Sequence, residues 1–181
     1  MTDKRFYDWQ TAGGTDDVMR FVACLERADI PWCAIDGVAV NHWADEPMVT
    51  RDVDFVVAVE AIEKTVELLE AEGFTPTRFE WSVNFKGASR VSIQLSTEEL
   101  YRLFPSRSVA ADVHGILLRV ASLGDTLVGK IAAWRDPRRR QSNRVKDFAD
   151  IVRLIEAHPH LWIDLPEELK KQIEKPELGD R

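Results

Sequence analysis

Long hydrophobic runs are absent from this sequence, and cysteine is scarce. No apolar stretch approaches the roughly 20 residues that a membrane-spanning helix needs, and the opening segment MTDKRFYDWQ lacks the apolar region of a signal peptide. We therefore expect a cytoplasmic location. The two cysteines, Cys24 and Cys33, have apolar neighbours and no nearby ligand partners. This excludes a zinc site and a disulfide framework, and it predicts that both thiols lie in the core.

An excess of positive charge is also missing. The formal net charge is −7 at pH 7, which argues against a protein that coats nucleic acid, because phosphate binding needs a positive surface. The four histidines show no spacing typical of a zinc site or a catalytic triad. With 45% hydrophobic and 30% charged residues, the 181-residue chain has the composition of an ordinary globular protein. It is long enough for one domain with a sizeable core.

Hydrophobic spacing predicts an alternation of helices and strands. Helices are expected at 16–28, 38–43, 61–72, 97–104, 123–135 and 145–158, and strands at 31–35, 52–57, 109–120 and within 74–96. Gly73 suits a left-handed helix end, and Ser122 with Asp125 resembles a capping box. We expect residues 1–120 to form an α/β core and residues 121–181 a helical part packed on it within the same compact unit.

Two aspartates, Asp52 and Asp54, stand at the start of the predicted strand 52–57. Side chains two residues apart on a strand point to the same face, so both carboxylates are directed to one place. Two like charges in a partly buried place are costly unless a cation bridges them, and Mg²⁺ prefers carboxylate oxygens. The pair predicts a magnesium site. The alternative is a solvated acidic pair at the edge of a strand.

The order of the elements resembles the nucleotidyltransferase superfamily: a helix, a short strand, an Asp-Gly turn that opens a helix, a loop, and then a strand with the Asp-x-Asp pair. The resemblance implies a fold of the α/β (α+β) class, with a small mixed sheet flanked by helices and followed by C-terminal helices. It also implies a nucleoside triphosphate as substrate and one or two Mg²⁺ ions on Asp52 and Asp54. Gly37 and Val38 would hold phosphate through backbone N–H groups, and Arg51 would meet a phosphate.

The later part of the chain resembles a narrower group, the AbiEii-like nucleotidyltransferases of toxin–antitoxin and abortive-infection systems. The motifs are a Lys-Ile-Ala-Ala run that begins at Lys130 and a Lys-Asp-Phe-Ala-Asp run that begins at Lys146, and the resemblance covers residues 15–157. It implies that Lys130 and Lys146 lie on the nucleotide side and that Asp147 or Asp150 orients the lysine or a basic partner. The alternative is an exposed lysine and an acidic turn that complements a helix dipole.

Two residues depart from the superfamily pattern. Val38 stands where a Ser or Gly follows the first turn glycine, which removes a small or hydroxylic group from the approach of phosphate. Gln94 is the best match to a third carboxylate on a neighbouring strand, and a glutamine can ligate a metal but cannot act as a base.

One basic cluster interrupts the acidic chain between the last two long helices. It contains Arg138, Arg139, Arg140 and Arg144. The cluster would bind the phosphates of a nucleotide or the end of a tRNA, or contact an RNA or protein partner; the alternative is a solvated loop. No aromatic residues interleave with it, and we expect the tryptophans to be core residues: Trp32, Trp43, Trp81 and Trp134.

Three functions remain open from the sequence. The first is a Mg²⁺-dependent transfer of a nucleoside monophosphate from a nucleoside triphosphate to a hydroxyl of a small molecule, protein or RNA. The second is a non-catalytic protein that binds a nucleotide or a partner, suggested by Val38 and Gln94. The third is an antibiotic-resistance transferase of the aminoglycoside type, since an acidic protein favours a cationic substrate.

Overall fold

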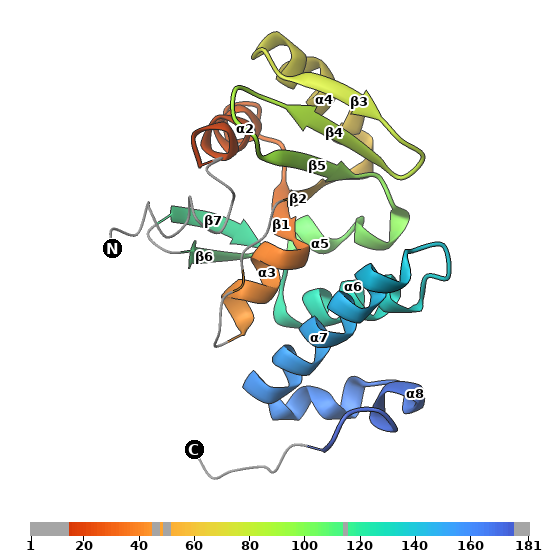
Figure 1. The fold of residues 1–181 in the computed structure, drawn as a ribbon. Coiled ribbons are helices and arrows are strands. Elements are labelled where there is room, and N and C mark those ends of the chain that lie inside the picture. Colours follow the sequence, from red (N-terminus) through yellow and green to blue (C-terminus); the bar gives the residue numbers. More distant parts are fainter. Residues whose placement is uncertain (1–14, 45–47, 49–51, 114–115, 176–181) are drawn as a thin grey trace.

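Across the residues that the computed structural model describes, 15–44, 48, 52–113 and 116–175, the strands form a seven-stranded mixed sheet (Figure 1). Its order is β3-β4-β5-β2-β1-β7-β6. β2 lies near the middle, antiparallel to β1 and parallel to β5. The strands are β1 Trp32–Ile35, β2 Asp52–Val57, β3 Thr75–Arg78, β4 Ser82–Lys86, β5 Ser92–Ser96, β6 Val109–Val113 and β7 Ile116–Val120.

Helices flank the sheet and continue beyond it. They are α2 Thr15–Arg27, α3 Asp36–Trp43, α4 Ile62–Ala71, α5 Phe104–Arg107, α6 Leu123–Arg135, α7 Gln141–Ala157 and α8 Glu167–Lys170, with 3-10 turns at Val59–Ala61, Glu99–Tyr101 and Pro159–Asp164. The prediction of an α/β fold with a mixed sheet and C-terminal helices is therefore confirmed. No helix within these described segments is long and apolar enough to cross a membrane.

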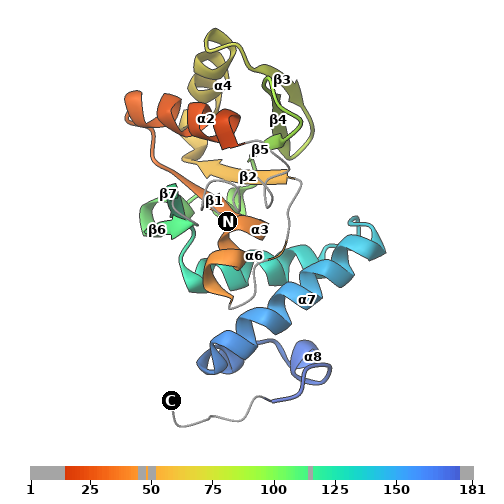
Figure 2. The same ribbon diagram turned by 60° about the vertical axis from the view of Figure 1, so that its left-hand side comes forward.

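The main core lies where α2 and α4 pack on one face of β2, β4 and β5 (Figure 2). Phe21 of α2 stacks on Phe55 of β2, with ring centroids 4.7 Å apart, and its edge meets Phe85 of β4. Alternation along β2 sends Val53 and Phe55 into this core. Asp52 and Asp54 therefore project from the opposite face. Cys24 and Cys33 are buried free thiols, as predicted.

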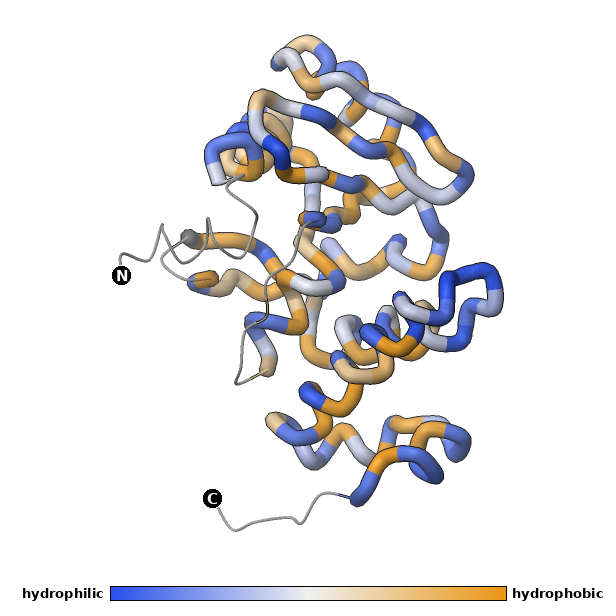
Figure 3. The backbone as a smooth tube through the Cα atoms, viewed as in Figure 1, coloured by the Kyte–Doolittle hydropathy of each residue, from blue (hydrophilic) through white to orange (hydrophobic). Residues whose placement is uncertain are grey.

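A second apolar cluster joins the C-terminal helices to α3. Leu127 of α6 packs there with Ile151 and Leu154 of α7, and α3 supplies Val40. The preceding residue of α3, Ala39, belongs to the main core. One helix therefore contributes to both clusters and connects the sheet to the C-terminal helices (Figure 1). The turn between α6 and α7 is strongly hydrophilic (Figure 3).

Local signals in the sequence predicted several element ends correctly. Gly73 has a φ of +90° after α4, and the Ser122 hydroxyl accepts a hydrogen bond from the Asp125 N–H at the start of α6. α7 begins at Gln141, four residues before the predicted position 145. The helix predicted at 97–104 is instead a 3-10 turn followed by α5. Pro105 lies in the first turn of α5, where proline loses no helical hydrogen bond.

Trp81 is not a core residue. It lies between β3 and β4, its exposed fraction is 47%, and the Arg138 guanidinium lies 5.4 Å from its ring centroid. Its place at a strand-to-strand turn keeps it at the surface, whereas Trp32, on a central strand, is buried as predicted. Arg51, His114 and Gly115 lie outside the described residues.

Candidate active site

Asp52 and Asp54 lie on the sheet face opposite the main core. Asp52 is exposed and Asp54 is half-buried. Burial, and to a smaller extent the Asp52 charge, raise the pKa of the Asp54 carboxyl to about 7, although Arg139 opposes the shift. The pair is therefore an electrostatically unfavourable arrangement that a bound cation would relieve.

Gln94 is the residue of β5 paired with Asp54 across the two parallel strands. Both side chains line one central pocket, defined by Asp36, Asp54, Gln94, Tyr101, Lys130 and Arg139. The structure thus places Gln94 on the strand beside Asp54, where the superfamily resemblance puts a third carboxylate.

The turn before α3 has an unusual first residue. Asp36 has a φ of +50°, in the left-handed region that glycine adopts most readily and Asp and Asn tolerate. Gly37 lines a pocket beside Asp52, and Val38 is buried in the main core with 3% exposure. Within the described residues no side chain caps the N-terminus of α3. A helix start without a side-chain cap can offer backbone N–H groups to an anion.

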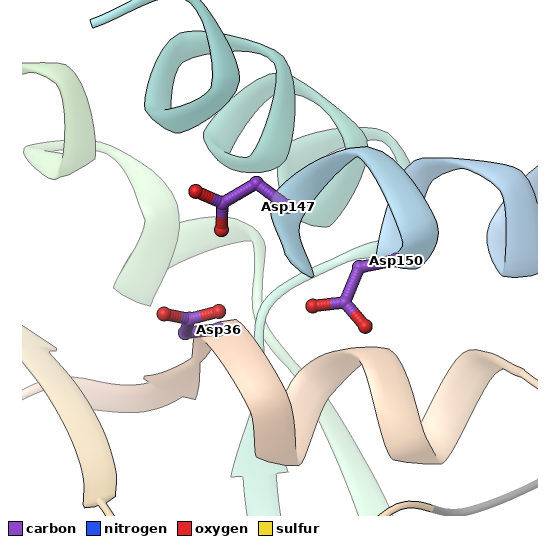
Figure 4. Close-up of side chains that lie close together, drawn as sticks. All are labelled: Asp36, Asp147 and Asp150. Atoms are coloured by element: carbon purple, nitrogen blue, oxygen red, sulfur yellow. The ribbon is translucent and has the colours of Figure 1, made fainter. Parts of the chain in front are cut away.

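Lys130 of α6 stands among three carboxylates, which we call the lysine cluster: Lys130, Asp36, Asp147 and Asp150. The Lys130 side chain is 6% exposed, and its ammonium pairs with Asp36, with Asp147 at 3.2 Å and with Asp150 at 2.8 Å. Figure 4 shows Asp36 at the start of α3 facing the two aspartates of α7. The interpretation of Lys130 as an exposed lysine is therefore wrong.

The carboxylates of the cluster have further cationic partners. Arg139 donates to Asp147 at 3.0 Å, and Arg153 donates to Asp150 at 2.9 Å. The three aspartates also have oxygens close enough to one another to hold a metal ion. In the structure the Lys130 ammonium pairs with all three.

Two open spaces flank the central pocket. The lysine-side pocket is lined by Gly37, Asp52, Asp54, Lys130, Asn143 and Lys146. The hairpin-side groove is lined by Glu80, Trp81, Gln94, Glu98, Tyr101 and Arg138. Asp54 belongs to the central and lysine-side spaces and Gln94 to the central space and the groove. The Asp54–Gln94 pair therefore borders all three spaces.

Some arginines of the basic cluster between α6 and α7 already bind other groups of the protein. Arg138 pairs with Asp136, and Arg144 donates to the Trp134 carbonyl. Arg139 lines all three spaces, and Arg140 is exposed. Sequence reasoning missed Asp36 as a contact of Lys130, because the two residues are 94 positions apart. It also missed Asn143, Tyr101 and Glu98, which carry no motif of their own.

The mixed sheet flanked by helices is a nucleotidyltransferase fold, and solved structures of that class resemble the chain. The antibiotic-resistance factor ANT(2'')-Ia matches with a TM-score of 0.54 at 9% identity, covering 78% of this chain and 83% of the other. The lincosamide antibiotic adenylyltransferase LnuA matches with a TM-score of 0.52 at 11% identity, and the match covers 77% of this chain and 96% of the other. An antigenic nucleotidyltransferase-like protein from Paracoccidioides brasiliensis matches with a TM-score of 0.54 at 19% identity, and the match covers 85% of this chain and 83% of the other.

The sequence itself gives the narrower assignment. Residues 38–175 match the family model described as nucleotidyl transferase AbiEii toxin, type IV TA system, and the chain belongs to this family. The predicted resemblance is confirmed. No curated protein matches the chain.

Proposed function

We propose that the protein transfers a nucleoside monophosphate from a nucleoside triphosphate to a hydroxyl acceptor, with Mg²⁺ at Asp52 and Asp54. One observation carries the proposal: the Asp-x-Asp pair faces a pocket whose other walls offer Lys130, Lys146 and the start of α3. This combination suits a metal-bound triphosphate, because the carboxylates attract the cation while the lysines and N–H groups attract phosphate.

The donor set fits magnesium. Two carboxylates and the Gln94 amide carbonyl offer hard oxygen ligands on adjacent strands. A cation would also offset the burial and the Asp52 charge, which together raise the pKa of Asp54. When bound there, Mg²⁺ would neutralise charge on the triphosphate and favour displacement at the α-phosphorus.

The two flanking spaces suit two different substrates. The triphosphate would occupy the lysine-side pocket, and the acceptor would approach along the hairpin-side groove. The acceptor hydroxyl oxygen attacks the α-phosphorus, the bond from that phosphorus to the bridging oxygen breaks, and pyrophosphate leaves. Gln94 can accept a hydrogen bond from the hydroxyl but cannot take its proton, so the proton passes to water. The need for a triphosphate also supports a cytoplasmic location.

Calorimetric titration with each nucleoside triphosphate, with and without Mg²⁺, tests the proposal. The wild type should bind one of them in a Mg²⁺-dependent way, and Asp54→Asn should lose that dependence. With an α-labelled triphosphate, the wild type should label an acceptor and Asp54→Asn should not. If Asp54→Asn labels an acceptor as well as the wild type does, the proposal is wrong.

Gln94 favours a second candidate, a binding protein without turnover, because it places an amide at the expected position of the third carboxylate. In that case triphosphate binds and no labelled product forms. Detectable labelling of any acceptor would exclude it.

The acceptor chemistry is open to direct tests in cells. Glu80, Glu98 and Asp136 line the groove and would favour a cationic acceptor such as an aminoglycoside; protection of cells against a drug panel would support that role. The family description favours a toxin that acts on a cellular acceptor. Growth arrest on expression of the wild type, and none with Asp54→Asn, would support it, with an RNA or protein acceptor.

A further inference from the structure

The ammonium expected to bind phosphate already has anionic partners inside the protein. Lys130, Arg139 and Arg153 form ion pairs with Asp36, Asp147 and Asp150, so three cations face three carboxylates. A triphosphate entering the lysine-side pocket would add several negative charges to a network that is already neutral. Such an addition is unfavourable unless one carboxylate gives up its cation.

Asp36 is the carboxylate best placed to give up its cation to the phosphate. Its side chain is 35% exposed, compared with 3% for Asp147 and 15% for Asp150. Asp147 and Asp150 each have an arginine partner besides Lys130. Asp36 comes from α3, whereas the other two come from α7 (Figure 4). It also lines both the lysine-side and the central pocket. It therefore stands in the space that phosphate would use.

We infer that the Asp36 carboxylate competes with the triphosphate for Lys130 and thereby holds the nucleotide affinity of the site down. The inference rests on the proposed function, because it concerns the phosphate side of the same site. Phosphate binding requires the Asp36–Lys130 ion pair to open, and the displaced carboxylate then lies beside the phosphate charge. The Asp36 carboxylate thus occupies the position that a phosphate would take beside Lys130. It sets the affinity for the triphosphate without touching the reacting atoms.

The same three aspartates have a rival interpretation as a metal site. The two interpretations predict opposite changes in binding affinity when Asp36 is replaced. Removal of a competing carboxylate tightens phosphate binding, whereas removal of a metal ligand weakens Mg²⁺-dependent binding.

The test uses two substitutions that keep the backbone of the turn. Asn and Gly both tolerate the left-handed conformation of residue 36, so Asp36→Asn and Asp36→Gly remove the charge without strain. Asp29→Asn is a matched control, because Asp29 has a φ of +52° in the exposed turn after α2. The ligands are inorganic tripolyphosphate without metal, and the Mg²⁺ complexes of the four ribonucleoside triphosphates, titrated by calorimetry.

Both Asp36 variants should bind tripolyphosphate on the order of tenfold more tightly than the wild type, and Asp29→Asn should bind like the wild type. Adding Lys130→Met to Asp36→Asn should remove the gain. Unchanged or weaker binding by both Asp36 variants, or no binding by any of the proteins, overturns the inference. The metal-free ligand does not depend on the Asp-x-Asp pair, so the loss or retention of labelling in Asp54→Asn decides the proposed function separately.

Discussion

Asp54 on β2 and Gln94 on β5 are paired residues of adjacent parallel strands, and both line the central pocket. The pairing puts a neutral amide beside a carboxyl whose pKa is already raised by burial and by Asp52. A further carboxylate at position 94 would therefore lower the stability of the protein unless a cation is present.

Gln94→Glu should accordingly make the stability of the protein depend on magnesium. In EDTA we expect a loss on the order of 1 kcal/mol, since a like charge is added beside Asp54. Mg²⁺ should restore stability and raise the labelling rate. Thermal unfolding in EDTA and in Mg²⁺ measures the effect. Asn84→Asp is the control, because Asn84 pairs with Gln94 one strand further from Asp54; an equal magnesium response in both variants would contradict the prediction.

Asp54→Asn should change how stability depends on pH. The Asp54 pKa of about 7 in the folded protein lies above the ordinary value of 3.8, so folding favours the protonated carboxyl. That contribution is complete below the ordinary value and is lost as the pH rises through the folded-state value. In EDTA the variant should therefore gain stability over the wild type between about pH 4 and pH 7, by on the order of 2 kcal/mol.

Urea unfolding of both proteins across this pH range measures the difference. Asp29→Asn, a change in an exposed turn, serves as the control. A constant difference between Asp54→Asn and the wild type at every pH would show that Asp54 has an ordinary pKa.

Lys130→Met should destabilise the protein strongly, because it leaves the buried carboxylate of Asp147 without its lysine and removes a buried cation from the cluster. Removing one partner from a buried ion pair costs about 3 to 5 kcal/mol. Lys170→Met changes a pair with the exposed residue Glu167 and should cost less than about 1 kcal/mol. Denaturant titration of the two variants compares them, and equal losses would argue against a structural role for the cluster.

The sheet and the C-terminal helices should unfold together, as one compact unit. We expect this because α3 contributes Ala39 to the main core and Val40 to the second cluster. Leu154→Ala, in the second cluster, should cost about 3 kcal/mol and shift one single transition. The exposed Ile163 offers the control, and Ile163→Ala should change stability by less than about 0.5 kcal/mol. Two separate transitions in Leu154→Ala would contradict the expectation.

Features set by local chemistry could be predicted from the sequence. Alternation in 52–57 predicted that Asp52 and Asp54 share a face, and the Ser122 cap and the left-handed Gly73 followed from residue type alone. Helix starts without a strong cap, such as that of α7, were placed too late.

Features set by long-range packing could not be predicted. The superfamily resemblance pointed to Gly37 in the turn before α3, whereas Asp36 is the residue of this turn with the left-handed conformation. The contact of Asp36 with Lys130 depends on how α6 packs beside α3. The exposure of Trp81 likewise depends on its position at a turn. Neither relationship has a signature in the sequence near the residue.

The stacking of Arg138 on Trp81 joins the β3–β4 turn to the α6–α7 turn, and both side chains line the hairpin-side groove. This contact thus links two turns that are far apart in the sequence along that side of the groove. We expect the link to restrict which acceptors fit the groove, and Trp81→Ala, assayed with matched acceptors that present a terminal or an internal hydroxyl, should widen the range that is labelled.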